Sequence, residues 1–256
     1  MSLTRAVLRI AVPLPRLEDY QRYLFIGPHP DDIEIGAGAS AAKLAKAGKD
    51  ICFLICADGR FGSGYVPELS PVELAAVRKE EAIRSALALS VKDVRFLELS
   101  DGGFYAMDDL LRAMAQVIGD FQPQVIFAPD PCVTSECHID HLNVGNAARR
   151  LSCFAPYSGI MAQYGAREAP VQALAYYMTA KPNRYIKTSG YMPAQLNAIF
   201  ACHKSQFPDH CPEAKAISTY LKLRAYDFGL RSLLGCAEGF RVLSPTHMHC
   251  LPEAGD

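Results

Sequence analysis

The first half of the chain alternates short apolar runs with longer segments that repeat apolar residues at helical spacing. The apolar runs, which we predict to be strands, span residues 23–27, 51–57, 94–99 and 125–128. The segments between them, which we predict to be helices, span residues 37–47, 73–89 and 110–121. Runs that are apolar almost without interruption are typical of parallel strands covered on both faces. The pattern therefore predicts an α/β fold, with a Rossmann-like, mostly parallel sheet and helices on both of its faces.

The pattern is looser after the fourth predicted strand. We expect a helix over residues 141–151 and a strand over residues 173–179, followed by helices over residues 193–203 and 214–230. The chain contains no internal repeat, low-complexity tract or linker, and its 256 residues fit one large domain. We therefore interpret residues 1–256 as a single domain.

Composition and charge exclude several classes of protein. Half of the residues are apolar and 21% are charged, which is typical of soluble globular chains. The formal net charge is −1 and no basic block occurs, so we expect no nucleic-acid partner. Residues 1–12 lack the uninterrupted apolar segment of a signal peptide, and no run approaches the ~18 apolar residues of a membrane span. We therefore expect a cytoplasmic protein without a membrane partner. Nine cysteines without a C-x-x-C pair indicate reduced thiols.

A first group of polar residues follows the first predicted strand. His29, Asp31 and Asp32 stand in the segment G-P-H-P-D-D over residues 27–32. Open α/β sheets bind ligands at the carboxyl ends of their strands, so an imidazole and two carboxylates lie where a site is expected. An H-P-D-D turn on its own fits a helix N-cap equally well, because aspartate favours that position.

A second group, H-I-D-H over residues 138–141, follows the fourth predicted strand. Parallel strands would bring both groups to the same edge of the sheet. A catalytic zinc site uses three nitrogen or oxygen ligands and keeps one position for water. One such set is His29, Asp32 and His141, which leaves Asp31 and His138 as acid or base groups. An H-x-x-H pair alone is weak evidence for a metal site, but the two groups of residues together predict one.

At these residues the sequence closely resembles the LmbE/PIG-L family of zinc-dependent N-acetylglucosaminyl deacetylases, whose motifs are H-P-D-D and H-x-D-H. Further similar segments are G-A-G-A-S at 36–40, R-K-E-E-A at 78–82, S-D-G-G at 100–103, H-K-S-Q at 203–206 and A-E-G-F at 237–240. The chain looks most similar to the bacterial branch that includes the deacetylases of the bacillithiol pathway. It departs from the family after the second strand, where T-x-G-E is common and A-D-G-R stands at 57–60.

The resemblance implies a role for each residue of the two groups. It implies that one zinc ion per chain is bound by His29, Asp32 and His141, and that Asp31 is the general base. His138, oriented by Asp140, would stabilise the oxyanion, and a nearby carboxylate would favour its imidazolium form. Either Asp31 or His138 would protonate the leaving amine.

The resemblance also implies the substrate and its contacts. The substrate would be an N-acetylated amino sugar of the GlcNAc type. Arg78 and His203 would contact it, although Arg78 also fits a surface charge and His203 a structural histidine. Related bacterial enzymes commonly form homo-oligomers, so we expect a homo-oligomer here.

Other interpretations of the same residues are weighed against this one. Clustered histidine and aspartate also hold metals in phosphoesterases, and a non-catalytic binding module could keep the fold. Gly36-x-Gly38 lacks the third glycine of a dinucleotide site. Cys132 and Cys137, which flank the second group, offer thiolate ligands. The C-terminal T-H-M-H-C segment contains three further candidate ligands, whose role stays open: His247, His249 and Cys250.

Overall fold

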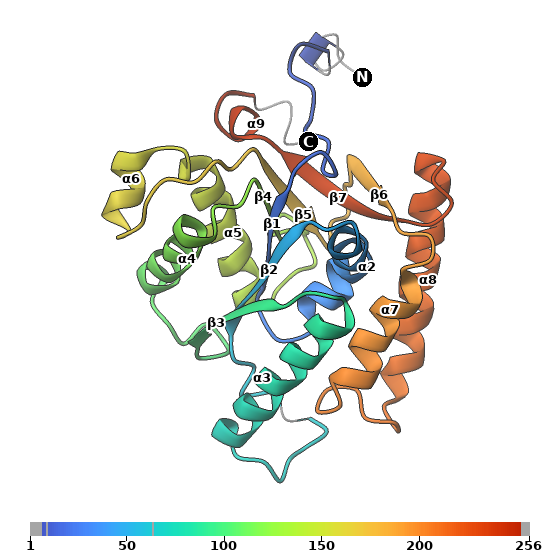
Figure 1. The fold of residues 1–256 in the computed structure, drawn as a ribbon. Coiled ribbons are helices and arrows are strands. Elements are labelled where there is room, and N and C mark those ends of the chain that lie inside the picture. The colour runs from blue at the N-terminus through green and yellow to red at the C-terminus, as the bar shows by residue number, and fades with distance from the viewer. Residues whose placement is uncertain (1–6, 9, 63, 252–256) are drawn as a thin grey trace.

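The computed structural model describes residues 7–8, 10–62 and 64–251, so much of the amino-terminal segment expected to be ordinary chain lies outside the described residues. A seven-stranded sheet of order β3-β2-β1-β4-β5-β7-β6 forms the centre (Figure 1). Its strands are β1 (Arg22–Gly27), β2 (Asp50–Ala57), β3 (Asp93–Leu99), β4 (Val125–Pro129), β5 (Ala173–Tyr177), β6 (Arg184–Lys187) and β7 (Ala237–Leu243). Neighbouring strands from β3 to β5 are parallel, whereas β7 runs antiparallel to β5 and β6. The predicted mostly parallel sheet is confirmed.

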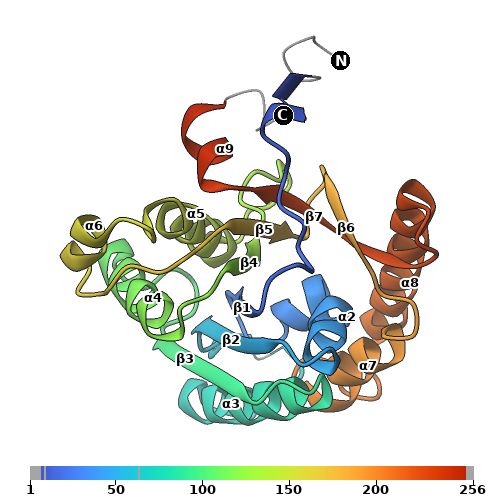
Figure 2. The ribbon, with the colours of Figure 1, turned by 45° about the horizontal axis from the view of Figure 1, so that its top comes forward.

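Helices cover both faces of this sheet, as the sequence predicts (Figure 2). They are α2 (Asp32–Lys46), α3 (Pro71–Ala88), α4 (Met107–Phe121), α5 (Ile139–Phe154), α6 (Ser158–Gln163), α7 (Met192–Asn197), the π-helix η1 (Ala198–Cys202), α8 (Pro212–Ser232) and α9 (Pro245–Cys250). Alternate residues of β1 belong to two different apolar clusters. Leu24 and Ile26 pack with α4 and α5, whereas Tyr23 and Phe25 pack with α2. This two-sided burial explains why the parallel strands are apolar at nearly every position.

Helix α2 begins earlier than the sequence indicates. The pattern predicts a helix over residues 37–47, but α2 starts at Asp32 and has a non-helical residue, Ala37, with φ of −151°. The Glu238 carboxylate accepts hydrogen bonds from the backbone of Ala39 at 3.2 Å and of Ser40 at 2.7 Å. The part of α2 after Ala37 is therefore capped like a separate helix. The sequence pattern predicts this second part of α2 and does not predict the first.

The antiparallel edge of the sheet was not predicted. β7 contains Glu238 and Arg241 among its apolar residues, and both charged side chains are buried. Arg241 pairs with Asp130 at 3.2 Å, which compensates its burial. Because charges interrupt the apolar run, β7 does not show the signal of a buried strand. Within the described residues, no helix combines the length and the apolar character needed to cross a membrane.

Replacing Gly36 with alanine places a methyl group against a fixed aromatic ring. A Cβ at Gly36 would lie 2.2 Å from the ring of Tyr177, which is fully buried and donates a 2.7 Å hydrogen bond to the Ile26 carbonyl. We expect Gly36→Ala to lower the free energy of unfolding by about 1–3 kcal/mol, because the overpacked core must shift. Urea denaturation measures the change. Gly159→Ala is the control, since open space surrounds its added Cβ and alanine favours a helix. Equal effects of the two variants would contradict the close packing at Gly36.

Candidate metal centre

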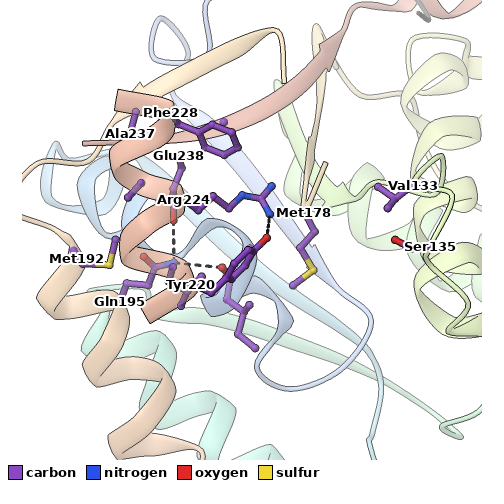
Figure 3. A pocket seen from close by; sticks show the side chains of 15 residues that line it. Val133, Ser135, Met178, Met192, Gln195, Tyr220, Arg224, Phe228, Ala237 and Glu238 are labelled. Atoms are coloured by element: carbon purple, nitrogen blue, oxygen red, sulfur yellow. Dashed lines mark hydrogen bonds between the residues drawn. The ribbon is translucent and has the colours of Figure 1, made fainter. Parts of the chain in front are cut away.

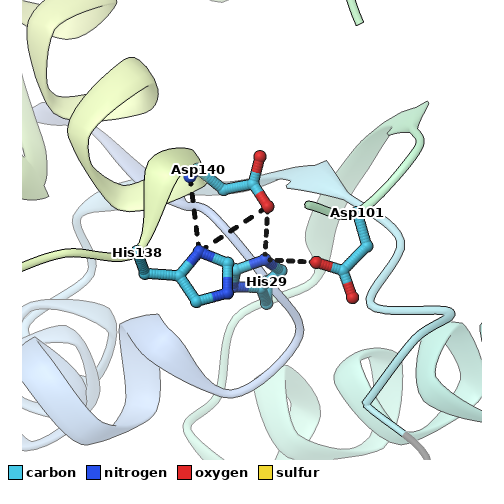
Figure 4. A group of neighbouring side chains, drawn as sticks. All are labelled: His29, Asp101, His138 and Asp140. Atoms are coloured by element: carbon cyan, nitrogen blue, oxygen red, sulfur yellow. Dashed lines mark hydrogen bonds and ion pairs between the residues drawn. The ribbon is translucent and has the colours of Figure 1, made fainter. Parts of the chain in front are cut away.

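Two features lie at the carboxyl edge of the parallel strands. One is a groove of about 320 Å³ lined by α7, α8 and the loop after β4 (Figure 3). The other is a cluster of histidines and aspartates from the loops that follow β1, β3 and β4 (Figure 4). Parallel strands place these loops at one edge, so residues far apart in the sequence meet there. All three residues of the predicted zinc-ligand set belong to this cluster.

The structure brings together the three side chains expected to bind zinc. Asp32 Oδ2 lies 3.3 Å from His29 Nδ1 and 3.3 Å from His141 Nε2. Ligand atoms about 2.0–2.2 Å from a tetrahedral zinc ion stand about 3.3–3.6 Å apart. The observed spacing and the donor set, two imidazoles and a carboxylate, therefore fit a zinc ion with an open position for water.

The second nitrogen of His29 faces two carboxylates (Figure 4). His29 Nε2 lies 3.1 Å from Asp101 Oδ1 and 3.1 Å from Asp140 Oδ2. Asp140 in turn accepts hydrogen bonds from the backbone of Gly102 at 2.7 Å and of Gly103 at 2.9 Å. Both glycines have positive φ, which lets the S-D-G-G turn present two N–H groups to one carboxylate. These carboxylates fix the ring with Nε2 toward them and Nδ1 toward Asp32, so Nδ1 is the nitrogen that could bind a metal.

Asp140 contacts His29 more closely than His138, the residue it was expected to orient. Its Oδ2 atom lies 3.7 Å from His138 Nδ1, compared with 3.1 Å from His29 Nε2. The backbone N–H of Asp140 instead donates to His138 Nδ1 at 3.3 Å, because His138 is the N-cap of α5. Asp140 therefore orients His138 mainly through its backbone and supports His29 through its carboxylate.

Glu136 stands in none of the sequence motifs, and Asp101 stands only in the S-D-G-G turn. Glu136 Oε2 lies 3.0 Å from His141 Nδ1, and Glu136 Oε1 accepts a 2.8 Å hydrogen bond from the backbone of His138. Asp101 supports His29 from a loop that follows another strand. Asp101 follows an apolar strand and stands directly before two glycines. This pattern indicates a turn at the carboxyl end of a strand, where a site residue is expected. Glu136 has no such local signal.

Asp31 has a strained backbone at the centre of the site. Its φ is +120° and its ψ is −27°, outside the regions that L-residues prefer. It occupies the N-cap position of α2, yet its side chain makes no capping hydrogen bond, so capping does not explain this residue. Such strain costs roughly 1–3 kcal/mol and is found at functional sites. Burial raises the pKa of Asp31 to about 6, although the charge of Arg78 nearby lowers it.

Arg78 is a buried residue rather than a surface charge. Its side chain donates to the Gly59 carbonyl at 3.0 Å, to the Pro30 carbonyl at 2.9 Å and to Asp31 Oδ2 at 3.4 Å. Gln206, with its amide oxygen turned toward the guanidinium, accepts from both terminal nitrogens at 2.6 and 2.9 Å. A Cβ at Gly59 would lie 2.3 Å from Arg78, so the A-D-G-R loop keeps the glycine that this close approach requires.

His203 is fully buried. Its Nε2 atom is 3.4 Å from Glu34 Oε1, and its Nδ1 atom finds no hydrogen-bond partner among the described residues. Although burial alone would lower it, the contact with Glu34 and the charge of Asp31 raise the pKa of His203. Because its side chain has no exposed surface, His203 contacts only other residues of the chain.

The electrostatics of the cluster favour a cation. Burial alone would lower the pKa of His29, but hydrogen bonds to three aspartates raise it to about 12. At His141, burial alone would also lower the pKa, but the hydrogen bond with Asp32 and the charge of that carboxylate raise it to about 9. In return, hydrogen bonds from these imidazoles hold the pKa of Asp32 far below its usual range, against the effect of burial. In the metal-free protein, the protonated imidazoles therefore supply the positive charge that balances these carboxylates. A bound metal ion would supply that charge instead.

The remaining candidate ligands lie outside the cluster. The strand register places the end of β7, and hence α9, at the amino edge of the parallel strands, opposite the cluster. In α9, His247 lies 3.1 Å from the Val12 carbonyl and caps the helix with Ser244. Among the residues that the structure describes, no group with metal-ligand geometry includes the histidines of α9 or the two thiols that flank the H-I-D-H segment.

Comparison with known proteins identifies relatives over most of the chain. Residues 24–152 match the PIG-L family, described as GlcNAc-PI de-N-acetylase. The chain is 33% identical over 241 residues to the diacetylchitobiose deacetylase of Thermococcus kodakarensis, a match that covers 92% of this chain and 88% of that protein. It is 31% identical over 204 residues to a 1D-myo-inositol 2-acetamido-2-deoxy-alpha-D-glucopyranoside deacetylase of Kineococcus radiotolerans, covering 68% of this chain and 56% of that protein.

The fold is also similar to that of a solved relative. The N,N'-diacetylchitobiose deacetylase from Pyrococcus horikoshii, in complex with an inhibitor, matches with a TM-score of 0.86 and 29% identity over 98% of this chain and 97% of that one. The expected α/β fold, family and N-deacetylase class are confirmed, whereas the bacillithiol-like branch stays a prediction. The chain belongs to the PIG-L family of N-deacetylases.

Proposed function

We propose that this chain is a zinc-dependent hydrolase that removes the acetyl group from the nitrogen of a GlcNAc-type amino sugar. The observation that carries the proposal is the convergence of His29, Asp32 and His141 beside Asp31, a carboxylate held in a strained conformation. The names of the relatives, which specify diacetylchitobiose and an inositol glycoside of an acetamido sugar, support the substrate class. A cytoplasmic location and a homo-oligomeric state stay predictions.

Asp31 is the general base of the proposed reaction. A zinc ion held by the three ligands would polarise the amide carbonyl and lower the pKa of a water molecule toward ~7. Asp31 accepts a proton from that water during attack on the carbonyl carbon. Its pKa of about 6 lies near neutral pH, so the same carboxyl group can return the proton to the departing amine.

His138 stabilises the negative charge that develops on the carbonyl oxygen. Its Nδ1 atom accepts from the backbone N–H of Asp140, so the neutral ring carries its proton on Nε2. The side chain is about half exposed, and its ring centroid lies 4.6 Å from that of His29. A half-exposed donor beside the metal ligands is placed to reach an oxyanion.

Arg78 and His203 act as positioning residues. The guanidinium of Arg78 is bonded to the loops on both sides of Asp31, so it holds the base and contributes positive charge near it. His203 contacts Glu34, and its charge lowers the pKa of Asp31. Both residues therefore affect the reaction through Asp31 rather than through contact with the acyl group.

Zinc binding to the metal-free protein should release protons. His29 and His141 must lose protons before they bind a metal, and their pKa values of about 12 and 9 mean that both carry protons at pH 7. Affinity should therefore rise with pH between 6 and 8, by up to about a hundredfold per unit when two protons leave. Calorimetry in buffers of different ionisation enthalpy measures the release. Metal analysis should give one zinc per chain, and two tightly bound metals would favour a phosphoesterase instead.

Asp31→Asn should abolish most of the activity and leave zinc binding intact. Asparagine tolerates positive φ, so the fold is kept while the proton acceptor is lost. We expect kcat for amine release from GlcNAc or diacetylchitobiose to fall about 10²–10⁴-fold. Asp109→Asn, an exposed change in the first turn of α4, is the control. An Asp31→Asn enzyme as active as the parent, at equal zinc content, would rule out the base role.

Arg78→Met should move the acidic limb of the pH profile upward. The base acts when Asp31 is deprotonated, so activity rises with pH through the pKa of that carboxyl group. Arg78 lowers this pKa, and removing its charge should shift the limb of kcat/KM to higher pH. Lys79→Met, which changes the adjacent and more exposed cation, should leave the limb in place. A uniform loss of rate without a shift would show that Arg78 serves only the fold.

A further inference from the structure

Helix α8 lies at the outer edge of the molecule, as Figure 1 and Figure 2 both show. It packs against β7 and β6. The residues that it buries all lie on one side of the helix, and they are Leu221, Ala225, Phe228 and Gly229. This side attaches α8 to the sheet, so the fold requires no apolar residue on the opposite side.

The opposite side of α8 is nevertheless apolar. Its large side chains are 60% to 93% exposed, and they are Leu223, Tyr226, Leu230 and the C-cap Leu233. They are separated by three, four and three residues, which is the spacing of the a and d positions of a coiled coil. Two exposed residues, Ala216 and Thr219, continue this spacing over the preceding heptad. We call these six residues the α8 seam.

The α8 seam is large enough to form part of an interface. Single exposed leucines are ordinary, but its four large side chains together offer on the order of 600 Å². Monomers rarely expose a contiguous apolar patch of more than a few hundred Å², and a stable interface buries about 800 Å² on each partner. A second helix packed along α8 would reach that area with the residues that flank the seam. Among the described residues, no element covers it.

The charges beside the seam favour a second copy of α8 in the parallel orientation. Lys222 is at a g position and Asp227 at the next e position. In a parallel pair of identical helices, Lys222 of each copy lies beside Asp227 of the other. Asp227 also pairs with Arg231 of its own helix at 2.8 Å, and a carboxylate can accept from both cations. In an antiparallel pair, g positions lie beside g positions, which are lysine at 215 and 222 and glycine at 229. Of the two orientations, only the parallel one pairs opposite charges there.

We propose that the α8 seam binds the same seam of a second copy of this chain, as a short parallel two-stranded coiled coil. The two-fold axis then runs along the helix pair, and each seam residue meets its own counterpart. The inference goes beyond the proposed deacetylase function. The family resemblance implies a homo-oligomer but names no surface, and no residue assigned to the metal centre lies in the seam.

Charged residues in the seam should separate the two copies. We expect Leu223→Glu with Leu230→Glu to raise the dissociation constant of the pair about a hundredfold or more, because the new carboxylates would have to be buried. Sedimentation equilibrium of the zinc-loaded full chain should then give half the mass of the parent assembly. Leu87→Glu is the matched control, since Leu87 is an exposed leucine on α3 and its replacement should leave the mass unchanged.

Reversing the flanking charges tests the parallel orientation and leaves the apolar residues in place. Lys222→Glu and Asp227→Lys should each raise the dissociation constant about tenfold, because each change turns two attractive pairs into repulsive ones. The chain with both changes should associate within about threefold of the parent, since the opposite charges meet again. A change that only disturbed the fold would show no such recovery.

Three results would overturn the proposal. They are a monomeric parent, seam variants that keep the parent mass, and single charge reversals whose effects persist in the combined variant. Circular dichroism shows whether each variant is folded. If the glutamate variants do not fold, the charge reversals decide, because both residues are exposed. The measurement is of mass, so it stays decisive even if the chain releases no amine and the proposed function is wrong.

Discussion

The imidazole of His29 is buried between carboxylates at the carboxyl edge of the sheet, and its two nitrogens face different groups. Nε2 points to Asp101 and Asp140, while Nδ1 points to Asp32. The ring cannot rotate without losing hydrogen bonds on both sides, so its orientation toward the proposed metal position is fixed in advance. Because these carboxylates come from loops after β1, β3 and β4, the geometry depends on the strand order β3-β2-β1-β4. The parallel half of the fold is therefore the scaffold of the metal centre.

Because the site depends on strand order, the sequence predicts some of its features and not others. The parallel strands are short, apolar on both faces and followed directly by polar motifs, so local pattern predicts that His29, Asp32 and His141 lie at one edge of the sheet. Their assignment as the zinc ligands is what the family resemblance implies. The contacts of Asp101 and Glu136 were missed because they depend on which loops meet in space. The two-part start of α2 was missed for a similar reason, since its cap comes from Glu238, about 200 residues away in the sequence.

Long-range contacts also change the roles that motifs suggest. Asp140 stands two residues from His138, which made it the expected partner of that ring, yet its carboxylate is closer to His29. Arg78 lies on a helix that sequence alone cannot place, and in the structure its guanidinium bridges the loops around Asp31. A motif thus indicates the candidate groups of a site, but it does not indicate the residues that contact and support them. The contacts of the supporting residues depend on packing between segments that are far apart in the sequence. Only the three-dimensional structure shows them.

The antiparallel edge of the sheet differs from the parallel half in the side chains that its strands bury. β7 was hard to predict because it buries Glu238 and Arg241, and those same charges are what the edge contributes to the groove and its surroundings. Glu238 caps the second part of α2 and also lines the groove, so it links the helix that contains Asp32 to β7. The parallel half of the sheet therefore carries the cluster of histidines and aspartates, whereas the antiparallel edge contributes to the groove.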